Sequence, residues 1–288
     1  MKSSVTVPAH AKVNLYLDVI GKRPDGYHEL VTLFERIDLA DELTLERVPG
    51  AGVEIRCGHP EVPRDGTNLV ARAVEGYRQA AGWTEGVRIT LKKRIPIAAG
   101  LGGGSSDAAA TLRGLQELTG PLLPEKKLVE LAQGLGSDAA FFLTPGPFAL
   151  GRGRGECLEP VPAPAHLWHL LVFPGFPVPT KSVYQAFALT HRGPDVRLLI
   201  RALRDSDVPK IVDLLFNALE PTVEKLYPAL QEVKAIFKEQ AGLARPMVSG
   251  SGSTVMALCA SRAEAEEAAQ LLHREKPNWQ MFVAATED

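Results

Sequence analysis

The chain has 288 residues, of which 45% are hydrophobic and 23% charged, and its formal net charge at pH 7 is −2. This composition excludes a disordered or fibrous chain, and the length allows one large or two ordinary domains. The small net charge provides no general basic field for nucleic acid or anionic lipid. No stretch approaches the roughly 18 consecutive apolar residues of a membrane span, and the N-terminus lacks an apolar signal core. We therefore expect a cytoplasmic protein that binds neither nucleic acid nor membrane.

The first part of the chain predicts strands followed by helices. Alternating apolar residues indicate strands over Val5–Val19, Leu30–Val48 and Val53–Cys57. Thr67 and Asn68 precede an amphipathic pattern that begins at Leu69, and such residues are typical helix caps. Further on, the apolar spacing predicts a strand around 87–91, a helix after residue 106 and another helix over 124–134.

The most informative feature of the sequence is a glycine-rich segment between a predicted strand and a predicted helix. Its glycines permit positive φ and a close approach of the backbone to a ligand, and a helix N-terminus presents free N–H groups to anions. Ser105, Ser106 and Asp107 are candidate caps for that helix. A flexible connector is the alternative, and the regular flanking pattern favours a phosphate-binding loop. The loop comprises Pro96, Ile97, Ala98, Ala99, Gly100, Leu101, Gly102, Gly103, Gly104, Ser105 and Ser106.

Two better-known glycine loops are excluded. A Walker A loop ends in Gly-Lys-Ser/Thr, but no lysine lies between Lys93 and Lys126. A dinucleotide fingerprint needs glycine at its sixth position, where this chain has Ser105. The loop is therefore rich in glycine and serine and has no lysine of its own.

The proline-rich stretch 160–164 reads as a linker, so we place a domain boundary there and predict domains over 1–160 and 161–288. The second domain contains another glycine-serine loop, Ser249–Ser253. Its patterns indicate an α+β layer with strands over Leu167–Phe173, Thr254–Cys259 and Trp279–Ala284 and helices over Ser182–Leu189, Val196–Leu203, Val208–Leu219, Val223–Gln240 and Arg262–Arg274.

Three motifs in this order resemble those of the superfamily of galactokinase, homoserine kinase, mevalonate kinase and phosphomevalonate kinase, the GHMP kinases. They are Ala11–Leu15, the glycine-rich loop with Asp107 and Ala108, and Ser249–Thr254. The resemblance implies a two-domain α+β fold, in which an N-terminal α/β domain carries the loop and a ferredoxin-like domain follows. Within the superfamily, Ala11–Leu15, Arg23–Leu30 and Gly136–Asp138 resemble kinases that act on a methylerythritol linked to cytidine diphosphate.

That resemblance implies a reaction and its cofactors. The γ-phosphoryl group of ATP would move to the 2-hydroxyl of the methylerythritol moiety, in the non-mevalonate route to isoprenoid precursors. The glycine-rich loop would bind ATP. Magnesium is implied by ATP chemistry, but its ligands are unassigned, with Ser105, Ser106 and Asp107 as candidates and Asp107 equally suited to the helix dipole. The sequence leaves the oligomeric state open.

Two residues match the catalytic pair of the resembled kinases. Asp138 would accept the proton of the attacking hydroxyl, and Lys12 would hold Asp138 ionised and stabilise developing negative charge. Without the resemblance, Asp138 reads as a helix N-cap and Lys12 as a solvated strand residue. Asn14 lies two residues beyond Lys12 on the same strand face and would hydrogen-bond the substrate hydroxyl or Asp138.

Four further residues match the substrate site of the resembled kinases. Tyr27 and His28 would recognise cytidine, with Tyr184 as a second aromatic face and Thr180 as a polar contact. The alternatives for the first two are a surface tyrosine and a turn histidine. The chain also departs from the family pattern, since Ala98 stands where glycine is common, which leaves the conformation of the loop less certain.

Three other functions are weighed against this kinase. A sister GHMP kinase acting on homoserine or mevalonate would need no aromatic residues to stack on a nucleobase. A noncatalytic nucleotide-binding regulator would not need both Lys12 and Asp138. A nicotinamide oxidoreductase is the most distant alternative.

Overall fold

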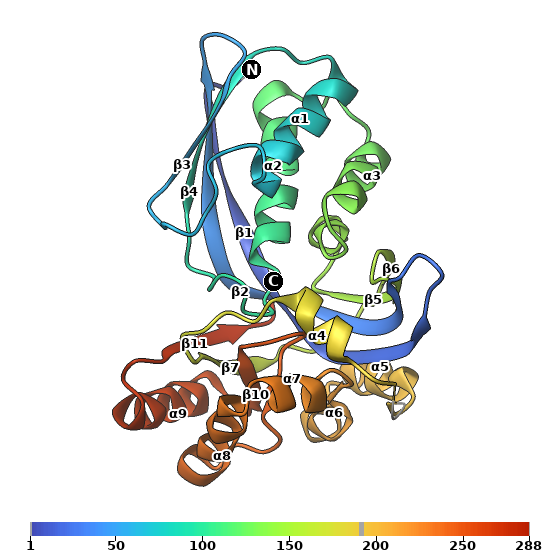
Figure 1. Ribbon diagram of the computed structural model, residues 1–288, viewed down its shortest axis with the longest axis vertical. Helices are drawn as coiled ribbons and strands as arrows, with labels where there is room; N and C mark the ends of the chain where they lie inside the picture. Colours follow the sequence, from blue (N-terminus) through green and yellow to red (C-terminus); the bar gives the residue numbers. More distant parts are fainter. Residues whose placement is uncertain (1, 190–192, 288) are drawn as a thin grey trace. The chain divides into compact units, whose positions relative to one another are not determined.

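The structure of the chain is a computed structural model that describes residues 2–189 and 193–287 (Figure 1). The chain divides into two compact units. Unit 1 comprises residues 1–11, 40–97 and 102–144, and unit 2 comprises residues 12–39, 98–101 and 145–288. The strands β1 (Ser4–Lys22) and β2 (His28–Val48) and the glycine-rich loop all contribute residues to both units. The predicted domain boundary after residue 160 is a different division, and it stays a prediction.

Unit 1 packs helices on one face of a group of strands (Figure 1). The strand β4 (Gly86–Lys92) pairs with the second half of β2 in antiparallel fashion and with β3 (Val53–Cys57) in parallel fashion. Leu45 of β2 lies directly under Gly114, where an added Cβ would be 2.7 Å from the leucine Cδ1. The helical elements are α1 (Leu69–Ala81), α2 (Gly103–Thr119), α3 (Glu125–Leu135) and the 3₁₀ turn η1 (Ala139–Leu143).

The two helices that follow predicted caps begin differently. The cap of α1 is confirmed, because Asn68 Oδ1 accepts a hydrogen bond from Val70 N at 2.9 Å. The predicted caps of α2 are wrong. The helix already begins at Gly103, after Gly102 in the left-handed region (φ 72°), and no side chain caps it. Ser105, Ser106 and Asp107 lie within the first turns instead, because glycines complete the turn into the helix before them.

Unit 2 contains a four-stranded antiparallel sheet with the ferredoxin-like chain order. The strands follow the order β11 (Gln280–Ala285), β7 (Trp168–Phe173), β10 (Val255–Cys259) and β9 (Met247–Val248). The helices α8 (Ala229–Ala241) and α9 (Arg262–Glu275) pack against this sheet (Figure 1). Together with unit 1, this sheet confirms the expected α+β fold class.

The remaining elements of unit 2 correct the sequence-based expectations. The predicted helix over 208–219 ends at Leu214, and the predicted helix over 223–240 is two helices that meet at Pro228, which has no N–H to continue the first. The sequence patterns also missed three short strands. The missed strands are β5 (Phe148–Gly153), β6 (Cys157–Pro160) and β8 (Phe216–Asn217). The other helices of unit 2 are α4 (Thr180–Ala186), α5 (Val196–Arg204), α6 (Val208–Leu214) and α7 (Glu220–Leu226).

Within unit 2 the middle of the glycine-rich loop packs against the loop Ser249–Ser253, backbone on backbone. A Cβ on Gly100 (φ +79°) would lie 2.1 Å from the carbonyl oxygen of Ser249. Thr254 N donates to Ala99 O at 3.2 Å, and Ser249 Oγ donates to Gly100 O at 3.2 Å. This approach is possible only because position 100 has no side chain.

We predict that Gly100→Ala destabilises the protein far more than Gly82→Ala. Both glycines have positive φ, +79° and +65°, but the space around Gly82 is open. A left-handed backbone conformation alone costs about 1 kcal/mol for alanine, and overpacking against Ser249 adds about 1–3 kcal/mol at Gly100. Urea unfolding of both variants measures the difference, and equal losses would contradict the proposed contact between the loops.

Candidate active site

Lys12 is a buried lysine of β1, only 4% exposed. Its Nζ donates to Asn14 Oδ1 at 2.6 Å and lies 5.6 Å from the centre of the Phe34 ring. Asn14 is held in turn, because its Nδ2 donates to Thr32 Oγ1 at 2.7 Å. Lys12 is therefore not the solvated strand residue of the simpler interpretation, and one hydrogen bond of its ammonium goes to a neutral amide. Thr32, which orients that amide, was not predicted from the sequence.

Both glycine-containing loops of unit 2 reach Lys12. Its backbone N donates to Leu101 O at 3.0 Å. A Cβ on Gly250 (φ +55°) would lie 3.1 Å from Asn14 Oδ1 and 3.4 Å from Lys12 Nζ. Thr180 Oγ1 is 2.8 Å from Ser251 Oγ. The structure thus brings Lys12, Asn14, residues 98–101, the second loop and Thr180 into one part of unit 2.

Asn217 of β8 holds the second loop in place, a role the sequence did not indicate. Its Nδ2 donates to Val248 O and Gly250 O, both at 2.8 Å, and its Oδ1 accepts from Leu219 N. The buried amide therefore satisfies two backbone carbonyl groups at the base of the loop and the N–H of Leu219.

The aromatic residues expected to recognise cytidine lie in unit 2 as well. The His28 ring is 5.3 Å from the Tyr184 ring and 5.9 Å from the Phe187 ring. Tyr27 is 54% exposed, and the Arg154 guanidinium lies 4.8 Å from its ring centre. Burial, helped by the charge of nearby Lys22, lowers the pKa of His28, which favours the neutral imidazole at pH 7. Arg154 and Phe187 were not predicted from the sequence.

Asp138 lies in unit 1, immediately before η1, and is half-buried. Its side chain makes no capping hydrogen bond to that turn, contrary to the simpler reading as a helix cap. Ser105 of the glycine-rich loop lies beside the same segment, since a Cβ on Gly136 would be 3.3 Å from Ser105 Oγ. Unit 1 therefore brings the end of the loop close to the segment that carries Asp138. The pairing of Asp138 with Lys12, which belongs to unit 2, stays a prediction.

Ala98 adopts φ +51° within the glycine-rich loop. This left-handed conformation is one that glycine takes without strain, which explains in physical terms why glycine suits the position. Its carbonyl oxygen accepts a hydrogen bond from Val178 N at 3.0 Å, so the loop adopts the turn despite the side chain.

A buried ion cluster lies at the base of the loop in unit 1. Lys93 Nζ donates to Asp41 Oδ2 and to Asp107 Oδ2, the latter at 2.8 Å. The pKa of Asp107 is raised to about 7, chiefly by burial, while the charge of Lys93 opposes the rise and that of Asp41 adds to it. Ser106 is buried beside it. Lys93 and Asp41 were not among the predicted site residues.

These contacts bear on the magnesium ligands that the sequence left open. Asp107 is engaged by Lys93, and across residues 2–189 and 193–287 no group of three or more His, Cys, Asp and Glu side chains is arranged to hold a metal ion. The residues present therefore do not form a protein-built metal site.

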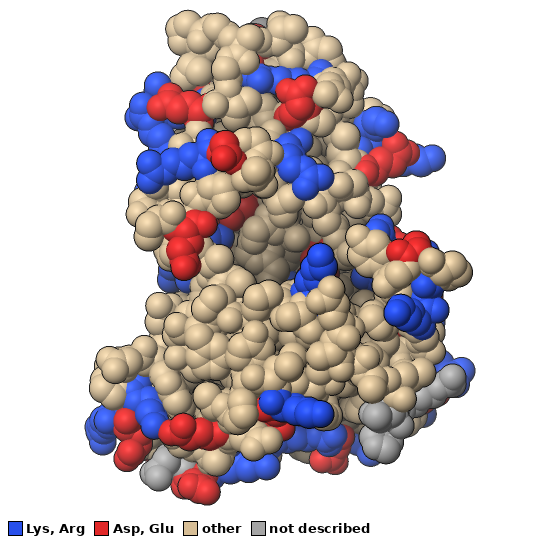
Figure 2. Space-filling model, viewed as in Figure 1, with Lys and Arg blue, Asp and Glu red and all other residues tan. Residues whose placement is uncertain are grey.

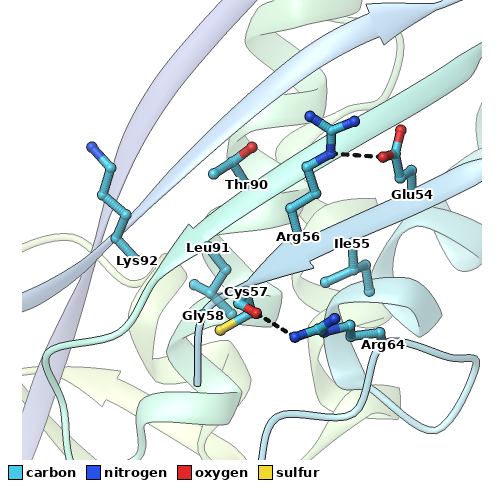
Figure 3. Close-up of a pocket in the computed structure, with 9 residues that line it drawn as sticks. All are labelled: Glu54, Ile55, Arg56, Cys57, Gly58, Arg64, Thr90, Leu91 and Lys92. Atoms are coloured by element: carbon cyan, nitrogen blue, oxygen red, sulfur yellow. Dashed lines mark hydrogen bonds and ion pairs between the residues drawn. The ribbon is translucent and has the colours of Figure 1, made fainter. Parts of the chain in front are cut away.

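A pocket of about 450 Å³ lies in unit 1, at the end of β3, and none of the predicted site residues line it. Figure 3 shows that its basic side chains do not converge. Arg56 pairs with Glu54, Arg64 donates to the carbonyl oxygen of Cys57, and Lys92 points away from both.

The surface carries mixed charge. Figure 2 shows Lys and Arg side chains interspersed with Asp and Glu over the face in view, in agreement with the net charge of −2. No helix within the described part of the chain combines the length and apolar character required to cross a membrane.

Comparison with known proteins places this geometry in a family. Residues 68–146 match the model of the GHMP kinases N terminal domain, and residues 198–278 match that of the GHMP kinases C terminal domain. A solved structure described as 4-(cytidine 5′-diphospho)-2C-methyl-D-erythritol kinase superposes with a TM-score of 0.82 at 38% identity, covering 99% of this chain and 100% of that chain. A homoserine kinase from Cytophaga hutchinsonii shares the fold at 23% identity and a TM-score of 0.78, covering 100% and 95% of the two chains.

Curated relatives agree over almost the whole length. The 4-diphosphocytidyl-2-C-methyl-D-erythritol kinase of Pelotomaculum thermopropionicum is 43% identical over 273 residues, 94% of each chain. The enzyme of the same name from Geobacter metallireducens is 42% identical over 269 residues, 93% of each chain. The chain therefore belongs to the GHMP kinases and, within them, to the family of 4-diphosphocytidyl-2-C-methyl-D-erythritol kinases.

Proposed function

We propose that the chain transfers the γ-phosphoryl group of ATP to the 2-hydroxyl of 4-diphosphocytidyl-2-C-methyl-D-erythritol, in the cytoplasm, as a step of isoprenoid precursor synthesis. The observation that carries the phosphoryl-transfer chemistry is the buried Lys12 ammonium, which lies against Asn14 and Gly250 while its backbone meets the glycine-rich loop. The choice of substrate is supported by the name shared by the relatives at 43% and 42% identity.

In the proposed reaction the substrate oxygen forms a bond to the γ-phosphorus while the bond from that phosphorus to the β,γ-bridging oxygen breaks. ADP leaves, and Asp138 accepts the hydroxyl proton. Lys12 stabilises the negative charge on the attacking and phosphoryl oxygens, and Asn14 keeps its ammonium in place. Phosphoryl transfer needs mainly such positioning and electrostatic stabilisation from a protein.

ATP would bind along Pro96–Ser106, where the backbone N–H groups at the start of α2 and the helix dipole favour phosphate. This arrangement supplies positive potential without a Walker lysine. Magnesium commonly accompanies ATP and takes most of its ligands from phosphate and water. The described residues offer no cluster of ligands for it.

The cytidine group would bind beside Tyr27, His28, Tyr184 and Thr180. Aromatic rings offer stacking surfaces, and a neutral imidazole both donates and accepts hydrogen bonds, which suits the edge of cytosine. The proximity of His28 to Tyr184 supports a joint site for the base. Homoserine and mevalonate have no nucleobase to stack. These aromatic side chains therefore favour the cytidyl substrate over the substrates of the sister kinases.

A coupled ADP-release assay tests the proposed function. The purified chain is supplied with ATP and, in turn, 4-diphosphocytidyl-2-C-methyl-D-erythritol, homoserine or mevalonate. We expect ADP release only with the first compound. Turnover of homoserine or mevalonate instead would identify a sister kinase, and ATP binding without turnover of any alcohol would identify a noncatalytic regulator.

We predict that Asp138→Asn lowers turnover by about a hundredfold or more, because an amide does not accept the hydroxyl proton. Binding of ATP should change little. Steady-state kinetics and a nucleotide titration measure the two effects. Asp205→Asn is the matched control, because Asp205 is an exposed carboxylate that pairs with Arg201 on α5. Equal turnover in the wild type and Asp138→Asn would remove Asp138 as the base.

We predict that Tyr184→Leu raises the KM for the cytidyl substrate by about tenfold, since stacking of a base on an aromatic ring contributes roughly 1–3 kcal/mol. The KM for ATP should stay the same. Tyr184→Phe keeps the ring and should behave like the wild type. If both variants raised the KM for ATP rather than that of the alcohol, Tyr184 would not belong to the cytidine site.

A further inference from the structure

A single buried lysine connects the two ends of the glycine-rich loop. Lys93 follows β4 and lies three residues before Pro96. Its ammonium donates to Asp41 of β2 and to Asp107 of α2. The side chains of Lys93, Asp41 and Asp107 are 7%, 0% and 5% exposed. All three belong to unit 1, so the cluster is an internal feature of that unit.

Asp41 fixes the segment that enters the loop. While its Oδ2 accepts from Lys93, its Oδ1 accepts from the backbone N–H groups of Arg94 and Ile95, the latter at 2.9 Å. One buried carboxylate therefore restrains both residues that precede Pro96, as well as the lysine.

Lys93 also lies against the end of the loop. A Cβ on Gly103, the first residue of α2, would be 3.3 Å from Lys93 Nζ and 3.1 Å from Ile95 Cγ2. Asp107, one turn further along α2, accepts from the same ammonium. The start of the helix therefore packs directly on the lysine and on the entering segment, and a larger residue at position 103 would push them apart.

The charges of the cluster do not balance when both carboxylates are ionised. Two buried carboxylates face one ammonium, and Asp107 Oδ1 has no hydrogen-bond partner. The raised pKa of Asp107, about 7, reflects burial first and the charge of Asp41 after it. When Asp107 ionises, the cluster gains a net negative charge close to the start of α2.

We propose that Lys93 is a positioning residue for the glycine-rich loop, acting through Asp41 and Asp107 rather than by touching the nucleotide. By holding the two carboxylates together, it sets the spacing between residues 94–96 and 103–106. This spacing orients the backbone N–H groups of the loop that would bind ATP. The proposal rests on the proposed function, in which this loop binds ATP.

Two variants at Asp107 test it through ATP kinetics. Asp107→Asn keeps an oxygen that accepts from Lys93, whereas Asp107→Leu has a similar shape and no acceptor. We expect Asp107→Leu to raise the KM for ATP at least about tenfold with kcat within about threefold, because the loop loses its position while the catalytic residues remain. Asp107→Asn should restore a KM within about twofold of the wild type.

The neighbouring Lys92 provides the matched control. Its side chain is 69% exposed, and its pair with Glu42 lies in solvent, so Lys92→Met should leave both kinetic constants unchanged. A folded Asp107→Leu protein with the KM of the wild type for ATP would overturn the proposal. Equal damage in Asp107→Leu and Asp107→Asn would overturn it too.

The pH dependence of stability gives a second test. A carboxyl whose pKa is raised by folding stabilises the protein below its unfolded pKa, and that contribution is lost as pH rises through the folded value. The contribution of Asp107 to the stability of the wild type should therefore be lost between about pH 4 and 7, whereas Asp107→Asn has no such group to titrate. We expect the Tm of Asp107→Asn minus that of the wild type to increase by about 3 °C across this range. A constant difference would overturn the charge balance inferred for the cluster.

Hydrogen exchange without nucleotide separates this proposal from the proposed function. Backbone amides of residues 102–106 should exchange at least about tenfold faster in Asp107→Leu than in the wild type. A wild type that releases no ADP with any alcohol would overturn the proposed function, and the exchange would still decide the role of the cluster. Unchanged exchange would overturn that role whatever the activity.

Discussion

Burial of the Lys12 ammonium is the constraint on which the proposed site depends. A cation removed from water costs several kcal/mol unless polar partners replace its hydration. Here Asn14 supplies an oxygen at 2.6 Å, Thr32 fixes the asparagine, and the ring of Phe34 faces the ammonium. The strand β1 therefore carries buried polar residues in its interior, and the neighbouring strand and loops are shaped around them.

The two loops around Lys12 approach it by having no side chains at the points of contact. Gly100 lies on the backbone of Ser249, and Gly250 lies on Asn14 and Lys12. The glycines therefore do more than allow flexible turns, since each one permits a specific close approach of main chain to main chain or to a charged group. Asn217 then holds the base of the second loop through two hydrogen bonds to backbone carbonyl oxygens.

The two buried lysines have different neighbours. Lys12 donates to the neutral amide of Asn14 and lies against the ring of Phe34. Lys93 faces two carboxylates, which neutralise its charge and connect three segments of unit 1. A cation between carboxylates suits positioning, because its field is already cancelled.

The sequence by itself determined the strand-loop-helix order around Pro96–Ser106, the cap of α1 at Asn68 and the alternation of β1, because local spacing and capping chemistry specify these features. It also singled out Lys12, Asn14 and Asp138, through motifs carried by short segments. Only the tertiary structure showed that Lys93 contacts Asp41 and Asp107 and that Asn217 holds the second loop. The physical reason is separation along the chain. Lys93 is 52 residues from Asp41, and which distant groups share one buried volume depends on packing, which local periodicity does not encode.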